Sequence, residues 1–205
     1  LTLTWTAGSG PIILEKGDVF TFACTEPGYG TTDLAAGITS LKADNTAIAA
    51  IVLSGRFPTA SASATVAAAM ATHASSLFTM YRPIRYLMDA GADIVATTKT
   101  AFAAFANERG AVCYGAETCT SGKPIVGMGS PKSSIVRSIA GRCAANLIST
   151  DPAWVSLGAL AGVTAITHDE FRTEQMDQKG FTTLRTHQGV AGFYPTNVRL
   201  MSAPG

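Results

Sequence analysis

The segment TAIAAIVLSGRFPTASASATVAAAMATHASSLFTMYRPIRYLMDAG, from Thr46 to Gly91, has a strand–helix–strand pattern that decides the fold class. The uncharged run at 46–55 predicts a strand that is buried on both faces, as in parallel sheets. A helix is predicted from about Ala62 to Tyr81, and Pro83 stops it. The next strand is predicted at 83–91. One face of the helix carries an apolar stripe, which we expect to face the core: Val66, Met70, Leu77 and Met80.

Strands and helices alternate on both sides of this unit. The sequence therefore predicts an α/β layered sandwich with a central mixed, largely parallel sheet flanked by helices and an antiparallel C-terminal edge hairpin. We expect residues 1–205 to form a single domain, with 1–16 as a terminal strand or small β appendage. Further helices are predicted at 31–44, 92–109, 168–180 and from Ser133 or Ser134 to about 147. Further strands are predicted at 1–7, 17–24, 111–117, 124–130, 162–167, in a hairpin at 181–194, and at 197–203.

The composition argues for a packed protein with a surface short of charge. Hydrophobic residues make up 47% of the chain and charged residues only 14%, with a formal net charge of +1. Surfaces of this kind are typical of subunits that are buried against neighbours. Because phosphate neutralisation needs clustered Lys and Arg, nucleic acid is not expected as a partner. No apolar run approaches the ~18 residues of a membrane-spanning helix, so no membrane insertion is expected.

The four cysteines are Cys24, Cys113, Cys119 and Cys143, and none forms a CxxC pair. Buried free thiols are the favoured interpretation, with a disulfide or a metal site as alternatives. The cytoplasm is then the default compartment. Because the chain begins at Leu1 without an initiator Met, we expect the full protein to have further residues at both ends.

The best candidate for a phosphate site is IVGMGSPKSS, from Ile125 to Ser134. It is predicted between a strand and a helix, where backbone N–H groups attract anions. The candidate ligands are Gly127, Gly129, Lys132 and Ser133. However, a proline precedes the lysine, whereas the P-loop pattern requires glycine there. An α/β enzyme or nucleotide-binding protein that uses this loop is therefore the alternative to a structural protein.

The histidines and charged residues do not form a recognisable catalytic motif. His73, His168 and His187 are dispersed, and no Gly-x-Ser-x-Gly elbow is present. The acidic residues beside His168 are favourable in the first turn of a helix, because they complement the helix dipole. They therefore need no catalytic explanation. Charges of alternating sign along 170–179 indicate either a solvated helix face or a contact with a neighbouring subunit. We therefore expect no catalytic residue, metal or cofactor.

In the C-terminal third, a short apolar strand, GVTAIT, precedes an acidic-polar helix and then FTTLRTHQGVAGFYPTNVRLMSAPG. This order of elements resembles the end of the sheath domain in contractile phage tail sheath proteins. The order of elements in KGDVFTFACTEPGYGTTDLAAGITSLKADNTAIAAIVLSG, residues 16–55, is also similar, so the resemblance covers most of the chain. The residues that fit the family's closing pattern are Gly180, Leu184, Arg185, Gly189, Gly192, Tyr194 and Asn197.

The resemblance implies a mechanical role in the virion, with assembly in the host cytoplasm. Sheath subunits sit in six-membered rings stacked around an inner tail tube, with baseplate or terminator proteins at the tail ends. Their terminal arms add strands to the sheets of neighbours, which leaves side-chain contacts free to change during contraction. The residues expected at such assembly edges are Leu1, Thr2, Leu3, Thr4 and Trp5 at one end and Asn197, Val198, Arg199 and Leu200 at the other.

Overall fold

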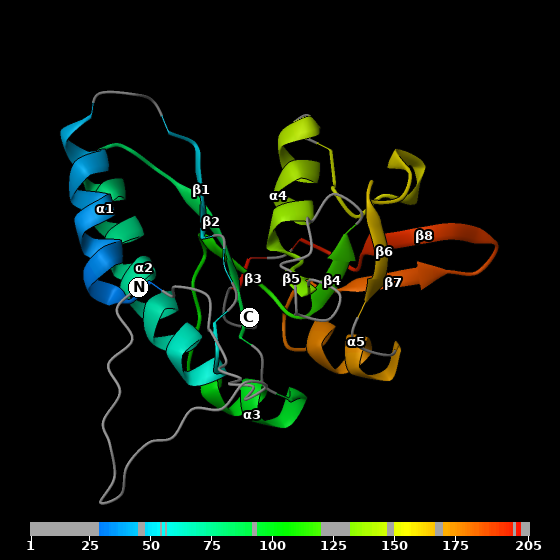
Figure 1. The fold of residues 1–205 in the computed structure, drawn as a ribbon. Coiled ribbons are helices and arrows are strands. Elements are labelled where there is room, and N and C mark those ends of the chain that lie inside the picture. The colour runs from blue at the N-terminus through cyan, green and yellow to red at the C-terminus, as the bar shows by residue number, and fades with distance from the viewer. Residues whose placement is uncertain are drawn as a thin grey trace, which may run out of the picture.

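The protein has a mixed α/β fold, as the sequence predicts (Figure 1). A parallel three-stranded sheet is flanked by helices, and an antiparallel hairpin lies near the C-terminus. In the part of the chain described, no helix is both long and apolar enough to span a bilayer. The computed structural model describes residues 29–44, 48–53, 55, 57–91, 94–119, 132–146, 150–166, 170–198 and 200–201.

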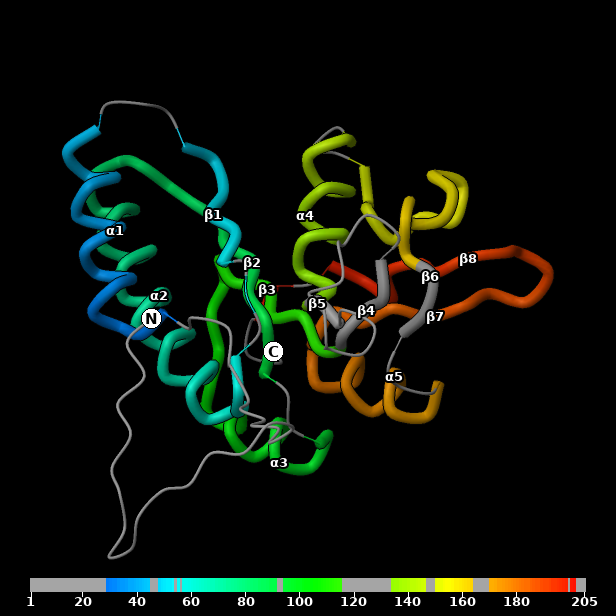
Figure 2. The backbone as a smooth tube through the Cα atoms, in the orientation of Figure 1, coloured from blue at the N-terminus to red at the C-terminus, as the bar shows by residue number. Residues whose placement is uncertain are grey.

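The parallel sheet has the strand order β1-β2-β3. Its strands are β1 (Ala50–Leu53), β2 (Arg85–Asp89) and β3 (Gly110–Cys113). Helices α1 (Thr31–Ala43) and α2 (Ala60–Thr79) pack on one face, and α4 (Val136–Ala145) packs on the other (Figures 1 and 2). The short α3 (Val95–Ala101) contacts α2. The central strand is therefore covered on both sides, as its nearly continuous burial confirms.

The remaining strands do not extend the parallel sheet but form two separate antiparallel units. Strand order in the first is β5-β4-β6, and β7 pairs with β8 in a hairpin. The elements are β4 (Ala116–Cys119), β5 (Lys132–Ser134), η1 (Val155–Leu157), β6 (Val163–Ile166), α5 (Glu170–Asp177), β7 (Leu184–His187) and β8 (Val190–Pro195).

The strand predicted at 111–117 is thus two strands in two sheets. Tyr114 and Gly115 separate β3 from β4, and the φ angle of Gly115 is 122°, a conformation that favours glycine. The chain leaves the parallel sheet at this point and enters the antiparallel one.

Helix α1 begins at Thr31, as predicted, and helix α2 begins at Ala60, two residues before its predicted start. The Gly30 N–H donates to Asp33 Oδ2 at 2.9 Å, and the Ala62 N–H donates to Thr59 Oγ1 at 3.2 Å. Three residues of the predicted α2 stripe are buried in the larger core cluster. The fourth, Met80, is 48% exposed because the helix ends at Thr79.

Two other helices differ from their predicted ranges. The helix predicted at 92–109 covers only Val95–Ala101, and Ile94, which precedes it, is 70% exposed. Threonines make up three of its seven residues, and Thr98 and Thr100 bond back to carbonyls four residues earlier. The helix predicted from Ser133 or Ser134 begins at Val136, because the residues before it pair with β4.

A buried carboxylate at the end of β2 joins three segments of the chain. Asp89 is fully buried, and its Oδ1 accepts a hydrogen bond from Ser134 Oγ at 2.7 Å. Its Oδ2 accepts from the Gly91 N–H at 2.9 Å and the Phe57 N–H at 3.3 Å. Ser63 Oγ donates to the main-chain oxygen of Asp89. We refer to these five residues as the Asp89 junction, which connects the parallel sheet to β5.

Replacing Asp89 with alanine is expected to destabilise the protein by about 2–4 kcal/mol, because buried donors lose their acceptor. Urea unfolding followed by circular dichroism measures the loss. The control is Glu108→Ala, at an exposed position, which is expected to change stability by less than about 0.5 kcal/mol. Equal midpoints for the two variants would contradict a structural role for the carboxylate.

Two glycine-to-alanine substitutions are expected to act in opposite directions. A Cβ at Gly110 would overlap the ring of Tyr86, which is fully buried, so Gly110→Ala should cost about 1–3 kcal/mol. A Cβ at Gly141, which is exposed on α4, meets no atom within 4 Å, so Gly141→Ala should stabilise the helix by up to about 1 kcal/mol. Thermal unfolding of both variants tests the pair, and a higher melting temperature for Gly110→Ala would contradict this packing.

Candidate assembly surface

The segment predicted as the last strand does not form one in its described residues. Asn197, Val198, Leu200 and Met201 have no strand assignment, and Arg199 lies outside the described residues. Val198 and Leu200 pack against the smaller core cluster instead of presenting a free edge. The prediction of a strand at 197–203 is therefore wrong for these residues. Leu1, Thr2, Leu3, Thr4 and Trp5 also lie outside the described residues, so their assembly role stays a prediction.

The chain's own C-terminal part covers the outer edge of β3. The Met201 N–H donates to the Gly110 carbonyl at 2.8 Å. Thr182 forms an isolated parallel bridge with Cys113, and its N–H donates to the Val112 carbonyl at 2.9 Å. The edge at β3 is therefore closed by intramolecular bonds, which removes it as a docking site for another chain.

Strand β1 lies at the opposite edge of the parallel sheet as described. Among the described strands, β1 pairs with β2 alone. The sequence predicts burial on both faces, yet Ala50 and Val52 are exposed, Val52 to 40%. The prediction of full burial is wrong for β1 as described, because neither its edge nor its faces are fully covered. An exposed apolar edge strand is a template for pairing with a further strand.

An apolar hollow lies on each side of the β1 edge. The first, of about 480 Å³, lies between β1 and α1 and is lined by residues that include Leu34, Ile38 and Leu41. The second, of about 570 Å³, lies toward α4 and has a more mixed lining that includes Arg85 and Cys143. Each hollow has room for side chains that the described residues do not supply.

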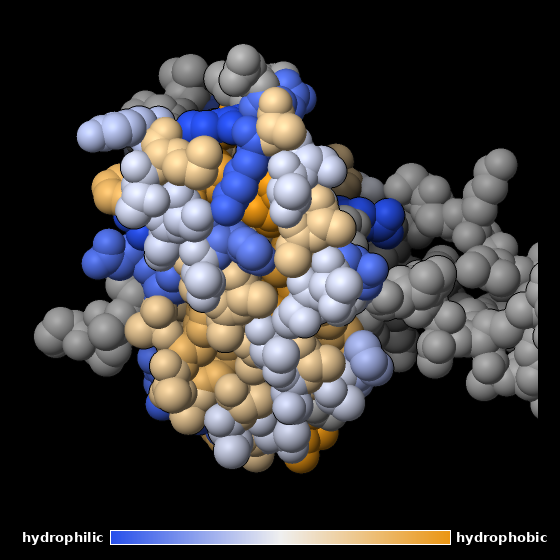
Figure 3. Space-filling view, turned by 90° about the vertical axis from the view of Figure 1, so that its left-hand side faces the viewer, coloured by the Kyte–Doolittle hydropathy of each residue, from blue (hydrophilic) through white to orange (hydrophobic). Residues whose placement is uncertain are grey.

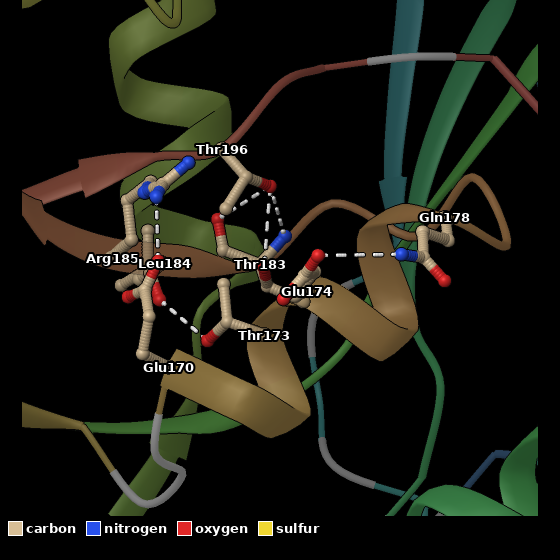
Figure 4. A network of polar contacts seen from close by, with 8 residues as sticks. All are labelled: Glu170, Thr173, Glu174, Gln178, Thr183, Leu184, Arg185 and Thr196. Atoms are coloured by element: carbon tan, nitrogen blue, oxygen red, sulfur yellow. Dashed lines mark hydrogen bonds and ion pairs between the residues drawn. The ribbon is translucent and has the colours of Figure 1, made fainter.

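The β7–β8 hairpin extends away from the body of the protein (Figure 1). Its tip is exposed, and Val190 is 44% exposed there. At its base, Thr183 and Thr196 are joined by hydrogen bonds of about 3.2 Å (Figure 4). A two-stranded hairpin is only marginally stable by itself in water, so its exposed half is well suited to contacts with another chain.

Helix α5 supports this hairpin through side-chain contacts. Arg185 Nη2 and Glu170 Oε1 form an ion pair of 2.6 Å, and Thr173 Oγ1 donates to the Leu184 carbonyl at 3.3 Å (Figure 4). The ion-pair side chains are 42% and 54% exposed, so the pair contributes little to stability. Of the charges at 170–179, Glu170 therefore contacts the hairpin. Arg172, Glu174 and Lys179 are exposed to solvent.

The face formed by α1 and α2 carries few charges. Figure 3 shows mostly weakly polar and weakly hydrophobic residues on this face, with the strongly hydrophilic ones gathered toward its upper end. Helix α2 contains no Asp, Glu, Lys or Arg in its 20 residues. Beyond its end, Met80 and Tyr81 are exposed to 48% and 95%. A face of this kind loses little hydration energy when another protein covers it.

The residues considered for catalysis do not come together in the described structure. His73 is half-buried on α2, and the His187 ring contacts the Tyr194 ring at 5.1 Å. His168 lies outside the described residues. Among the described residues, no group of three or more His, Cys, Asp or Glu is placed to bind a metal ion.

The structure describes the side chains of two of the four cysteines. Cys113 is buried, as predicted, and Cys143 is a half-buried free cysteine. Burial raises the pKa of the Cys143 thiol, and the nearby Arg142 opposes this effect. Cys24 and the side chain of Cys119 lie outside the description.

The candidate phosphate loop is described only at its end. Gly127 and Gly129 lie outside the described residues. Lys132 and Ser133 belong to β5, where they pair with Thr118 and Glu117. Neither lies at the start of a helix, which is the position a phosphate-binding loop requires. The predicted strand–loop–helix arrangement is therefore wrong for these two residues.

Two features of the structure were not predicted from the sequence. Asp89 follows an apolar strand and looks like an ordinary strand end, and its partner Ser134 is 45 residues away. The exposure of β1 could not be predicted, because its apolar sequence is typical of a strand that is buried on both faces. Both depend on which segments the fold brings together.

The comparison with protein families places the chain in one of them. The N-terminal domain of the DUF2586 family matches residues 10–199. The chain belongs to this family. A search of curated proteins gave no match. The family match covers both the parallel sheet and the β7–β8 hairpin, so these features lie within one family domain.

Proposed function

We propose that this DUF2586-family chain is a structural subunit of a contractile tail sheath. Its copies polymerise in stacked rings around an inner tail tube, and contraction drives the tube through the host envelope.

 In the sheath proteins that the sequence resembles, each of these rings has six members. The partners would be other copies of the chain, the inner tube protein, and baseplate or terminator proteins at the tail ends. The proposal involves no catalytic step and no cofactor, and it places the protein in the virion after assembly in the host cytoplasm.

The observation that carries this proposal is the projecting β7–β8 hairpin. It follows β6 and α5 in the order that the resemblance to sheath domains implies. Its tip is exposed and includes the apolar residue Val190. A strand from a neighbouring subunit that pairs with this hairpin would be held by main-chain hydrogen bonds, which do not depend on one arrangement of side chains.

The body of the protein has the rigidity that such a role needs. The Asp89 junction and the closed β3 edge hold the parallel sheet and the antiparallel unit together. Subunits with rigid bodies can rotate and slide relative to one another while flexible connections between them remain paired. In this proposal, the hairpin holds neighbouring subunits together, and the body of each subunit carries the mechanical load.

Electron microscopy of the purified full-length protein at high concentration is expected to show rings or tubes. Val190→Asp places a charge at the hairpin tip and should reduce the assembled fraction at least about tenfold, since an unpaired buried charge costs several kcal/mol. Sedimentation of the assembled material measures that fraction, and circular dichroism shows that the variant is folded.

The matched control is Ile94→Asp, which introduces the same charge at another exposed apolar position, outside the hairpin. We expect this variant to assemble like the unmodified protein. Protein that stays monomeric under all conditions that polymerise sheaths would contradict the proposed function. Equal loss of assembly in both variants would contradict the role of the hairpin.

A further inference from the structure

The β7–β8 hairpin is supported on two sides. On one side, helix α5 holds strand β7 through the ion pair and the hydrogen bond described above. On the other side, the Leu160 N–H donates to the Phe193 carbonyl of β8 at 2.9 Å. In Figure 1, α5 lies below the hairpin, and η1, which directly precedes this second support, lies above it. We refer to residues 158–160 as the brace.

The brace is packed closely against β8. Leu160 is only 6% exposed, and it belongs to the smaller core cluster, against which Phe193 packs. The φ angle of Gly192 is 98°, and a Cβ at this position would overlap the Cβ of Ala159. Glycine is therefore needed for β8 to approach the brace so closely. The contact leaves little room for the hairpin to move relative to the brace.

A buried arginine links the brace to helix α4. Arg142 is 8% exposed, and its Nη2 donates to the carbonyl of Gly158, the first residue of the brace. A charge-assisted hydrogen bond at a buried site is stronger than an interaction between exposed groups. By comparison, the Glu170–Arg185 ion pair on the α5 side has exposed side chains and is weak. Of the polar contacts that support the hairpin, the one through Arg142 is therefore the stronger.

The buried position of Arg142 is costly for a cation. One carbonyl acceptor offsets only part of the free energy that is lost when a charge leaves water. An apolar side chain of similar length would pack between α4 and the brace without this cost. However, it could not hold the Gly158 carbonyl at a fixed place and angle, because that requires a hydrogen-bond donor. The arginine is therefore explained better by the geometry it imposes than by stability.

We propose that Arg142 and the brace set the direction in which the hairpin projects and couple that direction to helix α4. Arg142 is a positioning residue, because it acts on the hairpin through the brace. Helix α4 in turn contacts β1 and β2, so the chain of contacts runs from the hairpin through the brace and α4 to the parallel sheet. The coupling is a property of one molecule. Its consequence, that Arg142 sets the geometry between neighbouring copies, rests on the proposed function.

The coupling extends to the exposed end of the hairpin. The two supports contact β7 at 184–185 and β8 at 192–193, which is the same level because Arg185 pairs with Tyr194. The turn and the exposed Val190 lie beyond this level. A hairpin clamped in this way turns together with its supports, so a small shift of α4 changes the position of the tip. Because coupling between two sites is reciprocal, a partner that binds the tip also biases the position of α4.

Distances between two spin labels in dilute monomer test the coupling. One label is placed at Gln188, in the hairpin turn, and the other at Ser75, an exposed position on α2. Both are attached through an unnatural ketone-bearing amino acid, which avoids the native cysteines. We expect Arg142→Met, which removes the donor, to widen the distance distribution at least about twofold, since a weakly supported hairpin samples several directions. Arg142→Lys, which keeps a donor, should restore part of the narrow distribution.

The matched control is Arg137→Met, the same change at an exposed position of α4, which should leave the distribution unchanged. Val190→Asp, the variant that reduces assembly in the proposed function, should also leave it unchanged. Because every distance is measured in the monomer, this inference and the proposed function can fail independently of each other.

A second set of variants tests the contact between the brace and the hairpin. Gly192→Ala should shift the mean distance between the labels, because the new Cβ displaces the brace from β8. Gly189→Ala also places alanine at a positive φ angle, of 78°, but its Cβ meets no atom within 4 Å, so the mean distance should stay the same. Adding Ala159→Gly to Gly192→Ala should return the mean distance toward the unmodified value.

A distribution that is equally narrow in Arg142→Met and in the unmodified protein would overturn the inference. If circular dichroism shows that Arg142→Met does not fold, the Gly192→Ala measurement decides instead. An unchanged mean distance in that variant would then overturn the inference, and a shift that Ala159→Gly reverses would support it.

Discussion

The fold depends on one buried carboxylate. Asp89 lies at the end of the central strand, where it accepts hydrogen bonds from the loop after β1, from its own turn and from β5. A buried charge without such partners would be strongly destabilising, so these three segments must come together for the sheet to form. The junction therefore ties the parallel sheet to β5 of the antiparallel unit.

The two edges of the parallel sheet have different roles. The β3 edge is covered by Thr182 and Met201, which come from segments far along the chain. The β1 edge remains open among the described residues, with an apolar hollow on each side.

Elements with a regular local pattern could be predicted, and elements decided by distant contacts could not. The apolar period of α2 and the turn between β7 and β8 are properties of short segments, and both were predicted correctly. The division of residues 110–119 between two sheets depends on the backbone at Gly115, and the path of the last segment depends on Met201 bonding to Gly110. The partners of Asp89 are up to 45 residues away, so no local pattern could reveal them.

The turn at Tyr114 and Gly115 has a mechanical consequence. Because β3 and β4 are consecutive, any force applied to the antiparallel unit passes along the backbone directly into the parallel sheet. The component of this force that lies along β3 acts on the hydrogen bonds to β2 in shear, so that they are stretched together instead of one after another. A ladder loaded in shear resists rupture better than one that is peeled open, so this short link is where strain from outside would be spread over the whole core.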